Sequence, residues 1–237
     1  MQVDGETPAA TVVLPGEAVQ IPNTRTTVKV GPGLRQDLEG IVVAKAGILK
    51  QSAHGDKVWV ESNQRRYVPA LNESVIGIVT AKHVENYRID IGGAHPASLG
   101  VLAFEGATKR NKPNLEIGML VFARVSLANK DMDPELDCIN PTNGKGDGYG
   151  EMKGGFMFKC SLGLCRSLMD PSNPFMQQLG NVCAFETAVG MNGRVWVKAE
   201  TPRQTVLLVQ ALLGSEPIPY SKAREYVKKF KAELSEQ

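Results

Sequence analysis

The chain has 237 residues, of which 22% are charged and 42% hydrophobic, and its formal net charge is +2. This composition is typical of a folded globular protein and excludes a disordered one. No run of about 18 uncharged apolar residues occurs, which excludes a membrane-spanning helix, and the first ten residues lack the features of a secretory signal. We therefore expect a protein of the nucleocytoplasmic space or of a prokaryotic cytosol that makes no membrane contact.

Residues 1–70 predict a small N-terminal β domain. Short segments rich in Val, Ile and Thr alternate there with turn-forming residues, which is the pattern of short strands. Apolar runs on both sides of Gly55-Asp56 predict a hairpin over 48–59.

Residues 71–140 predict a five-stranded OB-type barrel. The expected strands are 75–82, 87–91, 99–104, 120–127 and 136–139, and a long loop precedes the fourth. A barrel of this type keeps one face and its loops open to a single strand of nucleic acid. The Gly-rich segment 140–150 that follows predicts a flexible loop or linker.

Residues 151–237 predict a KH-like domain. The periodicity indicates strand, helix, helix, strand, strand and helix in that order, followed by a last, basic amphipathic helix over 221–234. Thr201 and Pro202 mark the start of the helix that ends near Gly214. The fold class is therefore multi-domain and mainly β, with an α+β C-terminal part.

The residue types that build metal and catalytic sites are sparse. None of the four cysteines forms a C-x-x-C pair, so buried free thiols are expected rather than zinc ligands or disulfides. The acidic residues Asp131, Asp133, Glu135 and Asp137 invite comparison with a nuclease cation site. No further cluster of ligands follows them in sequence, so a solvated acidic edge is preferred. We expect no metal, no cofactor and no enzymatic activity.

Three stretches carry a family resemblance. They are VIGIV with YRIDIGG (75–79 and 87–93), FEGATKRNKPNLEIG (104–118) and AVGMNGRVWV (188–197), the last with a G-x-N-G motif. Together with the domain order, they make the chain resemble the cap subunits of the RNA exosome over nearly its whole length.

This resemblance implies a non-catalytic role. Such cap subunits sit on a ring of RNase-PH-like proteins beside other cap subunits and guide single-stranded RNA into a central pore, towards an associated 3′-to-5′ nuclease. The N-terminal domain is then expected to dock on the ring and the barrel to face the pore. The resemblance also implies a part in ribosomal RNA maturation, and a location in nucleus, nucleolus and cytoplasm.

The best candidates for RNA contact are Lys109, Arg110 and Lys112, which cluster on the long loop of the barrel. A solvated surface or a contact with an acidic neighbour are the alternatives. Lys82, Arg88 and Arg124 come from neighbouring predicted strands and extend the same patch.

Tyr87 stands where this class of barrel often presents a ring for base stacking. It is also in phase with Ile89 and Ile91, so a ring buried in the core is an equal alternative.

The G-x-N-G motif has two interpretations. Gly190, Asn192 and Gly193 invite comparison with the loop that grips RNA backbone in ordinary KH domains, but that loop joins two helices. Here the motif lies between two strand runs, and Asn192-Gly193 predicts a hairpin turn of type I′. We therefore expect a structural turn.

Two other functions compete with the cap subunit. A free-standing RNA-binding factor would need a larger basic excess or more stacking rings than a net charge of +2 and 6% aromatic residues supply. A sibling cap subunit with the same domain order is the nearest relative to distinguish.

Overall fold

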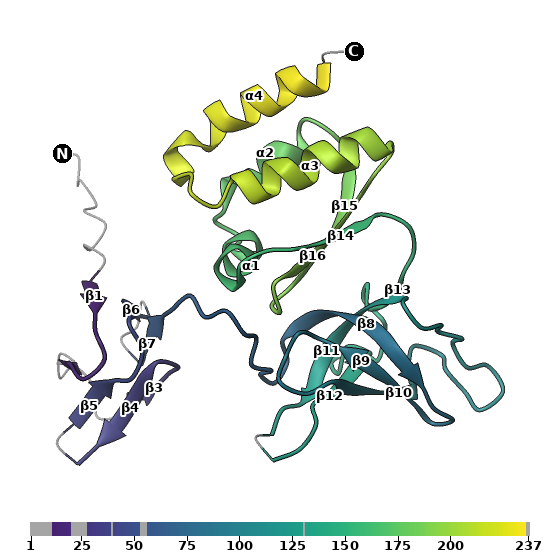
Figure 1. Ribbon diagram of the computed structural model, residues 1–237, viewed down its shortest axis with the longest axis horizontal. Coiled ribbons are helices and arrows are strands. Elements are labelled where there is room, and N and C mark those ends of the chain that lie inside the picture. The colour runs from purple at the N-terminus through teal and green to yellow at the C-terminus, as the bar shows by residue number, and fades with distance from the viewer. Residues whose placement is uncertain (1–10, 20–27, 39, 53–55, 130, 236–237) are drawn as a thin grey trace. The chain divides into compact units, whose positions relative to one another are not determined.

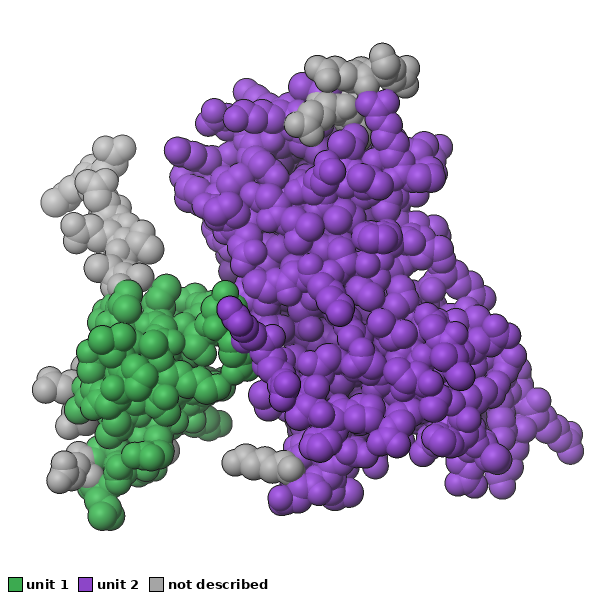
Figure 2. Space-filling model, viewed as in Figure 1, with its two compact units in different colours: residues 1–64 green, residues 65–237 purple. Residues whose placement is uncertain are grey.

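The computed structural model describes residues 11–19, 28–38, 40–52, 56–129 and 131–235 (Figure 1). They fall into two compact units, Met1–Gln64 and Arg65–Gln237 (Figure 2). The second unit thus begins before Ala70, because the buried Tyr67 packs in the barrel core and its hydroxyl donates to Glu73. Within the described ranges, no helix has the length and apolar character to cross a bilayer.

The first unit consists of two small β-sheets. One has the order β1-β6-β7-β3 and the other β2-β5-β4. The predicted hairpin is confirmed as the antiparallel pair β6–β7, although residues 53–55 of its turn lie outside the described residues. The strands are β1 (Thr11–Val13), β2 (Ala18–Val19), β3 (Lys29–Val30), β4 (Leu34–Asp37), β5 (Gly40–Val43), β6 (Gly47–Gln51) and β7 (Lys57–Glu61).

The second unit begins with the predicted five-stranded barrel, which is confirmed. The fifth strand pairs in parallel with the third and antiparallel with the fourth, and this double pairing closes the sheet. Alternating side chains of these strands fill its interior. The strands are β8 (Ser74–Lys82), β9 (Asn86–Asp90), β10 (Ala97–Phe104), β11 (Leu120–Leu127) and β12 (Glu135–Cys138).

Segment 140–150, predicted as a flexible loop or linker, is a loop that is folded against the barrel. The Tyr149 ring stacks on Phe122 with centroids 5.0 Å apart. Its hydroxyl lies 2.8 Å from that of Ser74. The Gly146 N–H donates to the Glu105 carboxylate. A further strand, β13 (Gly150–Met152), then pairs with β11. The glycine content concealed these anchors because they depend on partners far away in sequence.

The KH-like order of elements is also confirmed. The sheet has the order β14-β16-β15, and Figure 1 shows helices α2 and α3 on one side of it and the barrel on the other. Thr201 caps α3 as predicted, and its side chain accepts from the Gln204 N–H. The elements are β14 (Phe156–Lys159), α1 (Leu162–Met169), α2 (Pro174–Gly180), β15 (Phe185–Gly190), β16 (Arg194–Ala199), α3 (Pro202–Gly214), a 3-10 turn (Tyr220–Lys222) and α4 (Ala223–Ser235).

Candidate nucleic-acid interface

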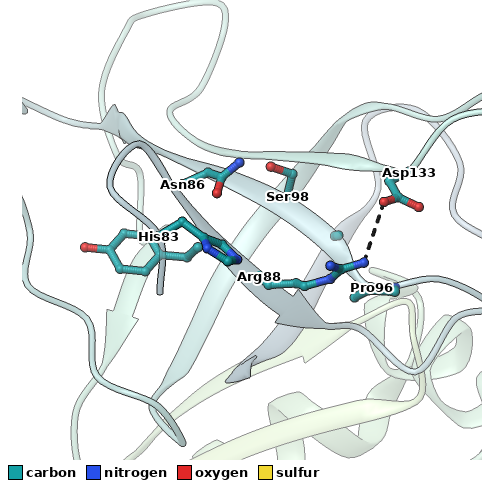
Figure 3. Close-up of a pocket in the computed structure, with 8 residues that line it drawn as sticks. His83, Asn86, Arg88, Pro96, Ser98 and Asp133 are labelled. Carbon is teal, nitrogen blue, oxygen red and sulfur yellow. Dashed lines mark ion pairs between the residues drawn. The ribbon is translucent and has the colours of Figure 1, made fainter. Parts of the chain in front are cut away.

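A shallow pocket of about 120 Å³ opens on the outer face of the barrel, over its second and third strands (Figure 3). In OB-type barrels these two strands and the loops beside them form the usual binding face for oligonucleotides. The loop between β8 and β9 supplies His83, and the segment before β12 supplies Asp133. The other polar side chains are Asn86, Arg88 and Ser98.

Strand alternation explains why these side chains point outward. Along β9 the residues Tyr87 and Ile89 are buried, so Asn86 and Arg88 face the solvent. Ser98 of β10 lies directly opposite Arg88 in the antiparallel register. The Arg88 guanidinium lies 3.9 Å from the Asp133 carboxylate, and both side chains are more than half exposed. This ion pair is therefore weak and leaves the guanidinium available to a phosphate.

Tyr87 is a core residue, which corrects its prediction as an RNA-binding ring. Its exposed fraction is 2%, and its hydroxyl donates to the Pro113 carbonyl at 2.6 Å. The ring points inward with Ile89 because both occupy the buried phase of β9. Tyr87 therefore fixes the long loop to the barrel instead of offering a stacking surface.

The basic loop is exposed, and its end at Pro113 and Asn114 is held to the barrel. Lys109, Arg110 and Lys112 all face the solvent, and none forms an ion pair with a described residue. Next to them, the Lys82 ammonium donates to the Asn114 side chain. Lys82 also lines a second hollow together with His83 and Asn86 of the pocket, so Lys82 lies between the end of the loop at Asn114 and the pocket.

Arg124 does not extend this patch, which corrects a second prediction. Its side chain is 12% exposed and lies 3.6 Å from the Asp137 carboxylate. It also donates to the Asn72 side chain at 2.6 Å. Cross-strand pairing of Arg124 with Asp137 holds the guanidinium against the barrel, so Arg124 stabilises the fold.

The G-x-N-G motif forms a turn, but a longer one than predicted. Gly190 pairs with Arg194 across the β15–β16 hairpin, which leaves a three-residue loop. Gly193 has a positive φ of 74° and Asn192 does not, so the type I′ geometry was wrong. A Cβ at Gly190 would approach the Ile76 nitrogen to 2.8 Å, so only glycine allows the hairpin tip to reach strand β8.

This hairpin tip joins the KH-like domain to the barrel. The Asn192 amide donates to the carbonyls of Ile76 and Ile91, at 2.8 and 2.9 Å. Its side-chain oxygen accepts from the Ile76 N–H at 3.2 Å. Arg194, which the sequence analysis did not select, forms an ion pair of 2.6 Å with Asp90. These contacts are buried, so the motif is unavailable to RNA backbone.

The segment that joins α1 and α2 offers no alternative site for the RNA backbone. Asp170 lies there and its carboxylate accepts from the N–H and hydroxyl of Ser172. A carboxylate at this place repels phosphate, whereas ordinary KH domains present bare backbone amides.

The cysteines and carboxylates form no metal-binding cluster in the described part of the chain. The thiols are free, with the sulfurs of Cys160 and Cys165 3.3 Å apart. Burial raises the pKa of the Cys138 thiol to about 12. No three His, Cys, Asp or Glu side chains among the described residues gather as metal ligands.

Comparison with known proteins decides the family. Three family models match successive parts of the chain: the exosome complex exonuclease Rrp40 N-terminal domain (residues 28–66), the exosome complex component RRP40 S1 domain (67–150) and the KH domain (155–203). Exosome complex component rrp40 of Schizosaccharomyces pombe is 46% identical over 209 residues, which cover 85% of this chain and 87% of that relative. This chain belongs to the RRP40 family.

Other relatives agree with the assignment. Exosome complex component RRP40 of Homo sapiens is 42% identical, over 91% of this chain and 80% of its own length. The sibling Exosome complex component Rrp4 of Pyrococcus furiosus is 23% identical over 82% of this chain. The predicted resemblance to exosome cap subunits is thereby confirmed, and the similarity favours RRP40 over this sibling.

A solved structure agrees in fold. It is a crystal structure assigned as an exosome complex RNA-binding protein, with a TM-score of 0.57 and 19% identity, and it covers 72% of this chain and 100% of its own. The RRP40 S1 model spans both the pocket and the basic loop, whereas α4 lies beyond the KH model, which ends at residue 203.

The sequence analysis missed several residues of the interface. His83, Asn86 and Ser98 belong to no recognisable sequence motif. The alternation along β9, which puts Asn86 on the same outward face as Arg88, could have identified Asn86. Asp133 was predicted as a solvated acidic edge, and the structure places it beside Arg88.

Proposed function

We propose that this member of the RRP40 family is a non-catalytic cap subunit of the RNA exosome that binds single-stranded RNA through its barrel. The observation that carries the proposal is the outer barrel face, where the loop cations Lys109, Arg110 and Lys112 adjoin the pocket that contains Arg88. Cations that follow an open barrel face suit a phosphate backbone and read no sequence. Contact with RNase-PH-like ring subunits, other cap subunits and an associated 3′-to-5′ nuclease belongs to this proposal, as does a part in ribosomal RNA maturation.

The absence of catalysis is part of the proposal. One of the four carboxylates that suggested a cation site, Asp137, lies in a cross-strand ion pair with the largely buried Arg124. A carboxylate held in this way acts as a structural partner, which favours a binding subunit. Location in the nucleus, the nucleolus and the cytoplasm is proposed from family membership alone.

Titration of the full chain with single-stranded RNA tests the barrel interface. The variant Lys109→Gln/Arg110→Gln/Lys112→Gln removes three positive charges from the loop. Each lost phosphate contact lowers the slope of log K against log salt by about 0.7, so we expect a decrease of about 2 together with weaker binding.

A matched control removes three exposed charges from the first unit, in the variant Lys29→Gln/Lys45→Gln/Lys57→Gln. It should bind RNA like the wild type. Equal losses in both triple variants would contradict a localised interface. Purification of the tagged chain from its own cells tests the partners, and recovery without any RNase-PH-like protein would favour a free-standing RNA binder.

A further inference from the structure

Helix α4 presents a basic outer surface that the barrel interface does not explain. Residues 151–237 carry 11 basic side chains, and five of these fall within 222–231, where Glu225 is the only acidic residue. The described side chains Lys222, Arg224, Lys228 and Lys229 are exposed. None of the four forms an ion pair with a described residue.

The inner side of α4 fixes this surface in place. Ala223, Val227 and Phe230 are buried in the core of the KH-like domain, and the Tyr226 hydroxyl donates to the Ala211 carbonyl of α3 at 3.0 Å. Because side chains four residues apart share a helix face, Arg224 and Lys228 lie next to each other on the outer side. The cations therefore form a positioned array on a packed helix.

This array is electrostatically unfavourable for the helix itself. Like charges four residues apart, such as Arg224 and Lys228, destabilise a helix, and Glu225 in the first turn offsets this only for Lys229, four residues after it. Lys222 and Arg224 also flank the helix N-terminus, where the macrodipole disfavours cations. A bound polyanion relieves both the repulsion between the cations and their unfavourable interaction with the macrodipole. A surface that serves only solubility is better built from interspersed positive and negative side chains.

The place of α4 in the fold separates it from the barrel interface. Figure 1 shows α4 on the outer side of α2 and α3, with the KH sheet between these helices and the barrel. RNA that occupies the pocket beside Arg88 must therefore extend past the KH-like domain to reach α4. The hairpin tip and the segment between α1 and α2, where a KH domain would otherwise bind, are respectively buried and acidic.

We propose that the outer face of α4, formed by Lys222, Arg224, Lys228 and Lys229, is a second phosphate-binding surface for the RNA that the barrel holds. It contacts the backbone outside the barrel segment and reads no sequence. This inference rests on the proposed RNA-binding function and adds a second contact to it. Its signature is an affinity that increases with RNA length.

The test compares two single-stranded RNAs on the full chain. One of about 8 nucleotides fits a single OB-type site, and one of about 40 nucleotides is long enough to reach α4 as well. The α4 variant is Arg224→Gln/Lys228→Gln/Lys229→Gln, in which glutamine keeps a helix propensity close to that of the residues it replaces. The barrel variant at 109, 110 and 112 and the control variant at 29, 45 and 57 lose the same charge.

We expect the α4 variant to bind the short RNA like the wild type and the long RNA roughly tenfold more weakly, with a salt slope lower by about 2. The barrel variant should weaken both RNAs, and the control neither. A thermal unfolding midpoint at or above that of the wild type shows that the fold of the α4 variant is intact.

Two results would overturn the inference and leave the proposed function standing. In the first, the α4 variant binds both RNAs like the wild type while the barrel variant is weakened. In the second, it binds RNA normally but no longer co-purifies with the exosome, which assigns the face to an acidic protein partner. Failure of the wild type to bind either RNA, alone or within the assembled complex, would refute the proposed function itself.

Discussion

Replacement of Asn192 by alanine probes the joint between barrel and KH-like domain. Asn192 is 7% exposed, and its side chain satisfies three backbone groups of the barrel. Of these, the Ile76 carbonyl keeps a second donor in Arg194, at 3.2 Å. The substitution therefore leaves two backbone groups without a partner, the Ile76 N–H and the Ile91 carbonyl.

The magnitude follows from those two groups. An unsatisfied buried donor or acceptor costs about 1–3 kcal/mol. For two such groups we expect Asn192→Ala to lower the free energy of unfolding by about 2–6 kcal/mol. Asn192→Asp should be at least as harmful, since it faces two carbonyl oxygens with a carboxylate.

Denaturant unfolding of the full chain, followed by a signal from residues 65–237, measures this loss. Asn181→Ala is a matched control, because Asn181 is exposed after α2, and it should change stability by less than about 0.5 kcal/mol. A normal unfolding free energy for Asn192→Ala would refute the structural role of the motif. If Asn192→Ala instead lost RNA affinity while its unfolding free energy stayed unchanged, the motif would have to be interpreted as an RNA-binding loop.

Two further predictions concern the same joint and the barrel core. Partial burial raises the pKa of Asp90, but hydrogen bonds from the Gly92 N–H and from Arg194, together with the charge of Arg194, bring this pKa below its ordinary value of 3.8. The ion pair therefore stabilises the fold above the unfolded-state pKa and is lost as pH falls through the folded-state pKa. Asp90→Asn should then reduce the fall of the unfolding free energy at acid pH. An unchanged acid dependence would contradict this. Tyr87→Leu should destabilise the chain by about 2–4 kcal/mol through a core cavity and change the RNA affinity of the folded protein little, whereas lost affinity at normal stability would show that the ring contacts RNA.

Local patterns in the sequence predicted the elements well. The alternation along β9, the long loop before the fourth barrel strand and the cap at Thr201 depend on neighbours a few residues apart, and such signals can be detected in the sequence. The basic residues of the long loop are exposed as expected of a charged run. The side chain of Tyr87 had two equal interpretations, because strand phase favoured the core and its position in this class of barrel favoured a stacking ring.

The tertiary structure decided the contacts between distant residues. Asn192 and Ile76 are 116 positions apart, and Arg194 and Asp90 are 104 apart, so no window of sequence joins them. The sequence also did not distinguish Arg124, which Asp137 and Asn72 hold through the strand register, from the exposed Lys109. The sequence by itself determined the order of elements and the family, because both follow from local patterning. Which cations face solvent and which hold domains together depends on register and domain packing, and these exist only in the folded chain.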